Sequence, residues 1–454
     1  MPFESINPTT GDVLETFVPT PPAVLERVLA RAEAAARDWR RRPVPERAAL
    51  LRGAAGLLRQ RKGAYARTMA LEMGKPLAQG EAEAEKCALA CEYFADRSGA
   101  WLAPQDYPTE ASRSFVRLDP LGPVLAIMPW NFPFWQVFRF AAPALVAGNV
   151  AILKHAPGVP RCALELEQLF RDAGFPEGVF TSVFLEPDAI GAVIADPRIR
   201  GVTLTGSPRA GASVAEHAGS ALKKVVLELG GSDPFIVLED ADVPRAAETA
   251  AEARLINSGQ SCIAAKRFIV VERVADQFLE GFTTAMQART VGDPLAPGTD
   301  VGPLARLDLR DALHRQVEES LKRGARLVCG GRVREGRGAF YPPTIVTAVA
   351  PGMPAFDEET FGPVAAVSRA RDEADALRLA NASVYGLGAS LWTEDRDRAE
   401  RLAAELEAGT VFVNALVKSD PRLPFGGIKR SGYGRELSEY GLREFLNVKS
   451  VWVA

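Results

Sequence analysis

Gly201-Val-Thr-Leu-Thr-Gly-Ser-Pro-Arg-Ala-Gly211 is the stretch of sequence that decides the fold. It starts as a short strand and passes through a tight turn into a helix, for which Ser207 is suited as the N-cap. The N–H groups at such a helix start can bind a phosphate, and Gly206 and Gly211 let the backbone approach a ligand closely. The spacing matches neither Gly-x-Gly-x-x-Gly nor the Walker motif, since Ala212 stands where that motif has lysine. An ordinary strand–helix turn is the alternative.

Strand-like segments alternate with helical patterns on both sides of this stretch, which is typical of an α/β fold. The expected first sheet contains Val124–Met128, Val150–Leu153, Gly201–Thr205, Val225–Leu229 and Phe235–Leu238. The expected strands after the Gly230-Gly231 turn are Phe268–Val271, Leu327–Cys329, Ala389–Trp392 and Thr410–Val413. Helices are expected at 243–257, 304–323, 372–381 and 394–407.

The length of 454 residues exceeds what one core usually holds, so we expect a first α/β domain up to about residue 228 and a second beyond it. Val448–Val453 has strand character but follows the last expected helix, so it could pair with another subunit. Residues 102–120 could form an arm of the same kind. Both segments point to a homodimer or a homotetramer.

Composition excludes several classes of protein. The chain is 47% hydrophobic and 24% charged, with a formal net charge of −3, which gives no reason to expect nucleic acid or a membrane as partner. No secretory signal is visible at the N-terminus, and the five cysteines form no disulfide framework, so a cytoplasmic location is expected. Cys87 and Cys91 lie one helical turn apart, but with three histidines in the chain no metal site is expected.

Ser258-Gly-Gln-Ser-Cys262 places a thiol in a polar bend between a helix and a strand, where it is presented for chemistry. A nucleophilic cysteine needs a lowered pKa or a nearby base. Glu228 ends an apolar strand, where burial would raise its pKa and suit it as a general base; capping a neighbouring helix is the alternative. Asn131, in Pro129-Trp-Asn-Phe-Pro133, could donate to an oxyanion or could be a turn residue. Lys154 follows a strand, at the sheet edge where ligands bind.

Together these segments resemble the aldehyde dehydrogenase superfamily, and most closely its bacterial succinate-semialdehyde branch. Seven motifs occur in the family's order over nearly the whole chain. They are Pro129-Trp-Asn-Phe-Pro133, Lys154, Gly206-Ser207 with Gly211, Glu228-Leu-Gly-Gly231, Gly259-Gln-Ser-Cys262, Glu358-Glu-Thr-Phe-Gly-Pro363 and Pro424-Phe-Gly-Gly427. The resemblance implies a Rossmann-like cofactor domain (1–101 and 121–228), an α/β catalytic domain (229–433), and a small β oligomerisation arm with the C-terminal segment (102–120 and 434–454).

The resemblance also implies roles for individual residues. Cys262 would be the nucleophile and Glu228 the base, and Asn131 would form the oxyanion hole with the Cys262 N–H. The cofactor side would comprise Trp130, Lys154, Pro157, Gly206, Ser207, Gly211, Leu229, Glu359 and Phe361. Within this set, Lys154 and Glu359 would hold the two riboses, Ser207 the pyrophosphate, and Phe361 would lie near the nicotinamide.

The substrate side would comprise Trp135, Arg139, Ser419 and Phe425. Trp135 and Arg139 share a helix face, and a buried arginine is costly unless it binds an anion such as a substrate carboxylate. We therefore expect succinic semialdehyde as substrate. The alternative places Arg139 in a buried salt bridge and makes the protein a general aliphatic or other semialdehyde dehydrogenase. A cofactor-independent cysteine esterase and a non-catalytic binding protein are more remote alternatives.

The position three residues after Lys154 bears on the choice of cofactor. In relatives that prefer NAD it often holds an acidic residue, which excludes a 2′-phosphate. Here it is Pro157, so NADP is favoured and NAD remains allowed.

Overall fold

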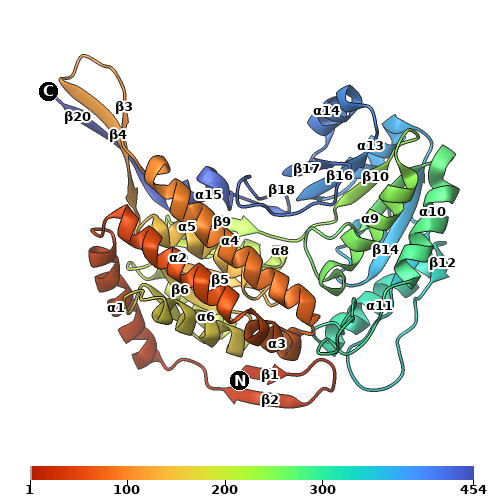
Figure 1. Ribbon diagram of the computed structural model, residues 1–454, viewed down its shortest axis with the longest axis horizontal. Coiled ribbons are helices and arrows are strands. Elements are labelled where there is room, and N and C mark those ends of the chain that lie inside the picture. The colour runs from red at the N-terminus through yellow and green to blue at the C-terminus, as the bar shows by residue number, and fades with distance from the viewer. Residues whose placement is uncertain (1–2) are drawn as a thin grey trace.

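The computed structural model describes residues 3–454, in which the chain forms two large parallel-type sheets (Figure 1). In this part of the chain the first sheet has six strands in the order β19-β9-β8-β5-β6-β7. They are β5 (Pro123–Met128), β6 (Val150–His155), β7 (Phe180–Ser182), β8 (Gly201–Thr205), β9 (Lys224–Glu228) and β19 (Gly432–Tyr433). All pairs are parallel except β19 with β9. The buried strands β5, β6 and β8 explain the continuous apolar runs of the sequence.

Helices cover both faces of the first sheet, with α2 and α4 stacked on one side (Figure 1). The helices are α1 (Pro22–Trp39), α2 (Val44–Gln60), α3 (Lys62–Met73), α4 (Leu77–Trp101), α5 (Trp135–Val146), α6 (Pro160–Asp172), α7 (Pro187–Ala195) and α8 (Pro208–Ser220). A hairpin of β1 (Phe3–Ile6) and β2 (Val13–Phe17) lies at the end of this domain nearest the second domain. None of the helices in residues 3–454 is both long and apolar enough to cross a membrane.

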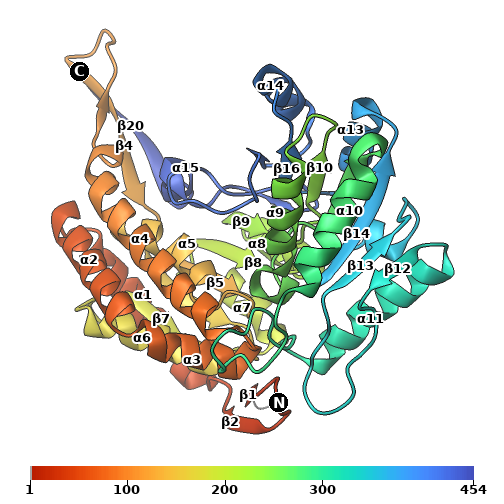
Figure 2. The same ribbon diagram turned by 45° about the vertical axis from the view of Figure 1, so that its right-hand side comes forward.

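The second sheet has seven described strands in the order β12-β13-β14-β11-β10-β16-β17. They are β10 (Pro234–Val237), β11 (Arg267–Val271), β12 (Arg326–Cys329), β13 (Thr344–Thr347), β14 (Val364–Ala370), β16 (Gly388–Trp392) and β17 (Thr410–Val413). Its helices are α9 (Val243–Leu255), α10 (Glu272–Gln287), α11 (Leu307–Lys322), α12 (Pro354–Asp357), α13 (Glu373–Asn381) and α14 (Arg396–Glu405). Figure 2 shows α9 and α10 side by side over this sheet.

The placement of β10 corrects one expectation. Phe235–Leu238 was expected in the first sheet, but β10 pairs in parallel with β11 and β16 of the second. The chain therefore changes sheets between Glu228 and Pro234, at the Gly230-Gly231 turn. The change matters for function because the turn joins the two cores directly behind Glu228.

The C-terminal segment returns to the first domain. After the short pair β15 (Tyr385–Gly386) with β18 (Ile428–Lys429), β19 joins the first sheet and α15 (Ser438–Arg443) packs near α5. The last strand, β20 (Leu446–Val453), pairs along its whole length with β4 (Arg113–Pro120), and β3 (Gln105–Asp106) completes a projecting arm (Figure 1). The C-terminal strand β20 thus pairs with β4 of its own chain. For the edge of β20 that faces β4, the expectation that it pairs with another subunit is wrong.

Candidate active site

The Cys262 loop leaves α9 through a backbone that few residues adopt. The turn Ile256–Gly259 has positive φ values at Asn257 (52°), Ser258 (56°) and Gly259 (76°). Three hydrogen bonds to other parts of the chain hold this turn and the residue after it. Gln79 Oε1 accepts from Asn257 N at 2.7 Å, Ser258 Oγ accepts from Gly302 N at 2.9 Å, and Gln260 Oε1 accepts from Ala305 N at 2.8 Å. Tertiary contacts therefore impose this conformation, which presents the thiol at the domain boundary.

Gly259 allows the loop to pack against the second domain. A Cβ atom at this position would lie 2.2 Å from the carbonyl oxygen of Gly362. We expect Gly259→Ala to lower the activity that depends on the Cys262 thiol by at least about tenfold, because the loop would have to move by an ångström or so. Gly298→Ala is the matched control, since Gly298 has a similar φ (+78°) but a Cβ atom there would meet no other atom within 4 Å. Equal activities of the two purified variants would contradict the steric explanation.

The Cys262 thiol is partly exposed, yet its surroundings favour the protonated form. Burial raises its pKa to about 12, and the positive charges of Arg139 and Lys266 only partly oppose this effect. Lys266 is fully buried and its Nζ donates to the carbonyl oxygens of Cys262 at 2.8 Å and Ser261 at 3.0 Å. The nucleophile therefore does not have the lowered pKa considered for it, and its activation requires a base.

Asn131 lies beside the Cys262 loop, as an oxyanion donor would. Its Nδ2 donates to the backbone carbonyl oxygen of Gln260 at 3.0 Å, and the backbone carbonyl oxygen of Asn131 accepts from Asn257 Nδ2. An amide nitrogen has two hydrogens, so the second remains available to a developing oxyanion. The Asn131 side chain is buried and cross-linked to the loop that it would assist. Its catalytic role stays a prediction.

Glu228 is buried at the end of β9, and within residues 3–454 neither of its carboxylate oxygens has a hydrogen-bond partner. The alternative in which it caps a helix is therefore wrong. Burial raises the pKa of Glu228 well above its usual range, and the negative charge of Glu436 raises it further, whereas Arg139 opposes the shift. A buried carboxyl with free oxygens and a raised pKa is what a general base near neutral pH requires.

Arg139 shows the largest departure from expectation. It is buried on α5, and its Nε lies 2.6 Å from Oε2 of Glu436. Its guanidinium also stacks 4.4 Å from the ring centre of Phe425 and Nη2 donates to Thr205 Oγ1 at 3.3 Å. The expectation that this arginine needs a substrate anion for compensation is therefore wrong, since Glu436 supplies the negative charge. The ion pair uses Nε and the hydrogen bond to Thr205 uses Nη2, so a contact between Nη1 and substrate stays a prediction.

Trp135 and Ser419 meet at the same wall. Trp135 Nε1 donates to Ser419 Oγ at 2.9 Å, which confirms that the loop after β17 faces this side of α5. Lys86 of α4 donates to the same oxygen at 2.9 Å. The four residues expected on the substrate side, Trp135, Arg139, Ser419 and Phe425, are thus linked by direct contacts to each other or to Lys86.

The cofactor candidates begin at the β8–α8 turn. Ser207 Oγ accepts from Ala210 N at 3.3 Å and is the N-cap of α8, as expected. Gly206 is open, since a Cβ atom there would lie no closer than 3.6 Å to another residue. The missing Cβ of Gly211 makes room for Leu229, whose Cδ2 lies 2.6 Å from the Cβ position. The turn at Gly206-Ser207 remains available to a phosphate, and the cofactor role of Gly211 stays a prediction.

Lys154 is the clearest sign of an anionic or polyhydroxylated ligand. It is the penultimate residue of β6 and is buried, which lowers its pKa. In residues 3–454 no carboxylate or other hydrogen-bond acceptor pairs with it. Burying an unpaired ammonium is costly unless a ligand compensates it. Pro157 is exposed three residues later and brings no negative charge. These residues fit a nucleotide ribose, with or without a 2′-phosphate.

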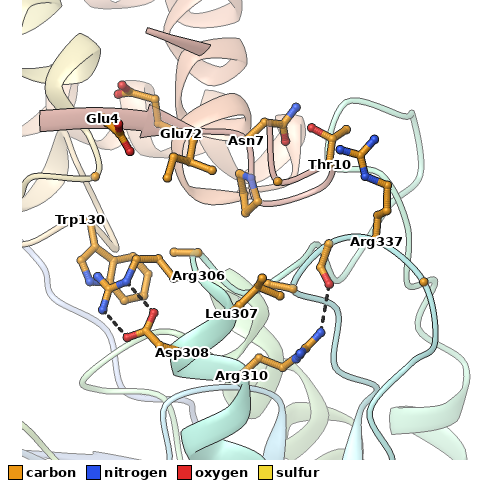
Figure 3. Close-up of a pocket in the computed structure, with 18 residues that line it drawn as sticks. Glu4, Asn7, Thr10, Glu72, Trp130, Arg306, Leu307, Asp308, Arg310 and Arg337 are labelled. Carbon is orange, nitrogen blue, oxygen red and sulfur yellow. Dashed lines mark hydrogen bonds and ion pairs between the residues drawn. The ribbon is translucent and has the colours of Figure 1, made fainter. Parts of the chain in front are cut away.

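Glu359 and Phe361 lie on the opposite, second-domain side. Oε1 of Glu359 accepts from Gly231 N at 2.9 Å and lies 4.0 Å from Lys266 Nζ. Phe361 meets Trp130 edge to face at 5.7 Å, so the two aromatic residues close the gap between the domains. Trp130 also lines a cavity of about 630 Å³ between the β1–β2 hairpin and α11 (Figure 3). Gly158, which follows Pro157, lines the same cavity. The cavity therefore adjoins two of the residues expected on the cofactor side, Trp130 and Pro157.

Three functional residues were missed from the sequence, namely Lys86, Lys266 and Glu436. Lys86 lies in an Ala/Glu-rich helix that reads as solvated surface, and Lys266 follows a polar loop. Glu436 carried a usable signal, because it follows the Pro424-Phe-Gly-Gly427 motif within a short glycine-rich stretch. Its partner could not be named, because the pair forms only when the C-terminal segment returns to α5.

Known proteins share this arrangement over the full chain. The model of the aldehyde dehydrogenase family matches residues 1–451. The chain belongs to the aldehyde dehydrogenase family. A probable NADP(+) succinate-semialdehyde dehydrogenase of Synechocystis is 49% identical over 454 residues, covering 100% of both chains. The NADP(+) succinate-semialdehyde dehydrogenase 1 of Mycobacterium tuberculosis is 47% identical over 459 residues, again with 100% of both covered. The succinic semialdehyde dehydrogenase of Streptococcus pyogenes, solved in complex with NADP+, is 39% identical with a TM-score of 0.97 over 99% of each chain.

This membership confirms the predicted fold class and enzyme class. The chain is an α/β aldehyde dehydrogenase, an oxidoreductase that uses a nicotinamide dinucleotide to oxidise aldehydes. The resemblance found in the seven motifs is therefore real over the whole chain. That the open turn at Gly206, the unpaired Lys154 and the Trp130–Phe361 pair form one cofactor cleft stays a prediction.

Proposed function

We propose that this aldehyde dehydrogenase oxidises succinic semialdehyde to succinate and prefers NADP. The relatives in Synechocystis and Mycobacterium tuberculosis carry that activity in their names and match the chain end to end. The observation that carries the proposal is the cationic substrate wall, in which Lys86 lies over the ring of Trp135 and Arg139 follows four residues later on the same helix α5. A second aldehyde that bears a carboxylate would fit the same wall, so the test compares charged and uncharged substrates.

The chain's own residues can carry out the covalent chemistry. The Cys262 thiol loses its proton to a water molecule, and the thiolate attacks the aldehyde carbon. The oxyanion that forms is stabilised by the free hydrogen of Asn131 Nδ2 and the Cys262 N–H. When bound, the nicotinamide cofactor accepts a hydride. Glu228 then takes a proton from water, which cleaves the resulting thioester on Cys262 and releases the acid. The polar atoms of Lys154, Ser207 and Glu359 would hold the cofactor.

Lys154 also supports the proposed cofactor preference. An ammonium without a protein partner attracts a 2′-phosphate, and Pro157 supplies no carboxylate to repel it. Initial rates with NADP and NAD at equal concentration would test this. Equal kcat/KM values for the two cofactors would contradict the preference without touching the substrate proposal.

We expect the double variant Arg139→Met/Glu436→Gln to raise the KM for succinic semialdehyde by about 10- to 100-fold, through loss of a charge-assisted contact from Nη1. The KM for butanal should change by less than about threefold. Both charges are removed together because Arg139→Ala alone would leave Glu436 buried and unpaired, which costs about 3–5 kcal/mol of stability.

Glu436→Gln alone is the matched control, since the glutamine oxygen can still accept a hydrogen bond from the guanidinium, which stays charged, so the preference for succinic semialdehyde should be retained. Steady-state kinetics of the three proteins give the comparison. An equal rise in KM for both aldehydes in the double variant would show that Arg139 only supports the fold.

We also propose a homo-oligomer and a cytoplasmic location. The arm β3–β4–β20 exposes Tyr107, Val448, Trp452 and Val453, an apolar surface suited to a second subunit. All five cysteines are free thiols, which suits a reducing compartment. Light scattering of the purified protein would separate a dimer from a tetramer.

A further inference from the structure

Lys86 is a charged group in the substrate wall that the catalytic chemistry does not use. It lies on α4, half-buried, and its Nζ stands 4.3 Å from the ring centre of Trp135. No carboxylate forms an ion pair with it in residues 3–454. The nearest candidate on α4, Glu83, is occupied by Lys75 and by the N–H groups of Phe134 and Trp135. A cation enclosed in this way lacks its counter-ion in the ligand-free protein.

The hydrogen bonds around Ser419 show which kind of ligand is missing. Its Oγ accepts from Lys86 Nζ and from Trp135 Nε1, each at 2.9 Å. A hydroxyl oxygen has two lone pairs, so both are engaged and its hydrogen is left to donate. Lys86 keeps two further N–H donors. The cluster therefore offers donors and a positive charge but no acceptor, which suits an anion.

The surroundings of Lys86 connect this cluster with the reacting thiol. Lys86 lines a cavity of about 330 Å³ together with Phe132, which follows Asn131, and with Leu255 and Ile256, which lead into the Cys262 loop. Arg139 acts on the pKa of both Lys86 and Cys262, so its charge lies near both groups. The cavity beside Lys86 therefore reaches residues that adjoin Asn131 and lead into the Cys262 loop, which is the direction in which an extended substrate held at Lys86 would carry its aldehyde.

We propose that Lys86 is a substrate-binding residue and that, with the donated hydroxyl of Ser419, it holds the carboxylate of the aldehyde substrate. The inference rests on the proposed function and adds a second cation to Arg139. Arg139 is already neutralised by Glu436, whereas Lys86 has no such partner among the residues that the structure describes. Lys86 therefore contributes the uncompensated charge that separates a semialdehyde from an uncharged aldehyde.

The main test compares kcat and KM of the holoenzyme for succinic semialdehyde and butanal, with NADP, in the wild type, Lys86→Met and Lys86→Arg. Methionine keeps the length of the side chain and removes the charge. We expect Lys86→Met to lower the ratio of kcat/KM for the two aldehydes by about 10- to 100-fold, mainly through the KM for succinic semialdehyde. Lys86→Arg should restore most of the ratio. Lys418→Met is the matched control, because it removes an exposed charge one residue from Ser419 and should leave the ratio unchanged.

The pH dependence of the same ratio gives a second readout. Burial, helped by the charge of Arg139 and opposed by Cys87, Glu83 and Asp420, lowers the pKa of Lys86 to about 8. Glu252 of α9, with Arg289 and Asp300, faces the same cavity from the other side. Lysine loses its charge as the pH rises through its pKa, so the preference for succinic semialdehyde should fall above pH 8. The fall should vanish in Lys86→Arg, and forming the ratio cancels the titrations of Cys262 and Glu228.

The outcomes separate this inference from the function on which it rests. A wild-type enzyme with no preference for succinic semialdehyde over butanal overturns the proposed function and the inference together. A wild-type preference that Lys86→Met retains within about twofold overturns the inference alone. An equal loss of activity toward both aldehydes in Lys86→Met also overturns it, since it would assign Lys86 a structural role.

Discussion

Replacing Cys262 with alanine will lower kcat for aldehyde oxidation by about four orders of magnitude or more. Without the thiol no covalent intermediate forms, and the remaining groups can only bind the reactants. The assay is the appearance of reduced nicotinamide on mixing with succinic semialdehyde and NADP. The loss should affect charged and uncharged aldehydes equally, because the nucleophile acts on the aldehyde carbon of both.

The other cysteines provide the controls for this experiment. Cys87, Cys91 and Cys162 are fully buried with pKa values raised well above the usual range by burial, so only Cys329 competes for a thiol reagent. Cys329→Ala should keep wild-type activity and still lose it on treatment with iodoacetamide. Oxidation by Cys262→Ala within tenfold of the wild-type rate would refute the assignment of the nucleophile.

The rate of alkylation should also report the state of the thiol. With a pKa of about 12, Cys262 is almost wholly protonated at neutral pH in the cofactor-free enzyme. The thiolate fraction, and with it the alkylation rate, should therefore rise about tenfold per pH unit between pH 7 and 9. A rate that is flat over this interval would mean that a neighbouring base already holds the proton.

Glu228→Gln should give an enzyme that reacts once and then stops. The first step would release about one reduced nicotinamide per active site, and steady-state turnover would then fall by about 10²- to 10⁴-fold because no base activates water. Glutamine has nearly the same shape and the native oxygens make no hydrogen bond within the described residues, so folding should be little affected. Stopped-flow absorbance separates the burst from the steady state, and mass spectrometry would find the acyl group on Cys262.

The pH profile distinguishes a base from a structural carboxyl. Burial and the charge of Glu436 raise the pKa of Glu228, so the carboxylate form that accepts a proton becomes more populated as the pH rises. Thioester hydrolysis should therefore accelerate with pH in the wild type until Glu228 is ionised. Glu228→Gln should lose this dependence. A variant without a burst, in which both phases slow equally, would place Glu228 in the first step instead.

The sequence predicted the parts of the fold that local patterns determine. The buried strand Gly201–Thr205 and the half-buried edge strand Thr410–Val413 have the predicted bounds, because both are short, mostly apolar runs of residues that favour strands. The sheet to which Phe235–Leu238 belongs could not be predicted, because strands far along the chain supply its partners. Periodicity also failed to identify β13 and β14, which follow loops that contain glycine and proline.

The candidate site, like the fold, could be predicted from the sequence only where local patterns determine it. Cys262, Glu228 and Asn131 could be singled out, since each interrupts its local pattern and lies within a family motif. The compensation of Arg139 by Glu436 and the bridging of Lys86 to Ser419 could not, because both pairs join segments that only the folded chain brings together. The same reason explains why the packing of Leu229 against Gly211 was not predicted.

The turn at Ile256–Gly259 has a consequence for how such chains can diverge. Its conformation depends on Gln79 of the first domain and on the backbone of Gly362 in the second, and Asn131 bonds to the next residue, Gln260. A gene recombined near the Gly230-Gly231 turn would inherit these contacts from two different parents. Such a hybrid could keep both sheets intact and still lack a correctly placed nucleophile. Descent should therefore transmit the two domains together, and new substrate ranges should arise by replacing side chains on the substrate wall rather than by exchanging domains.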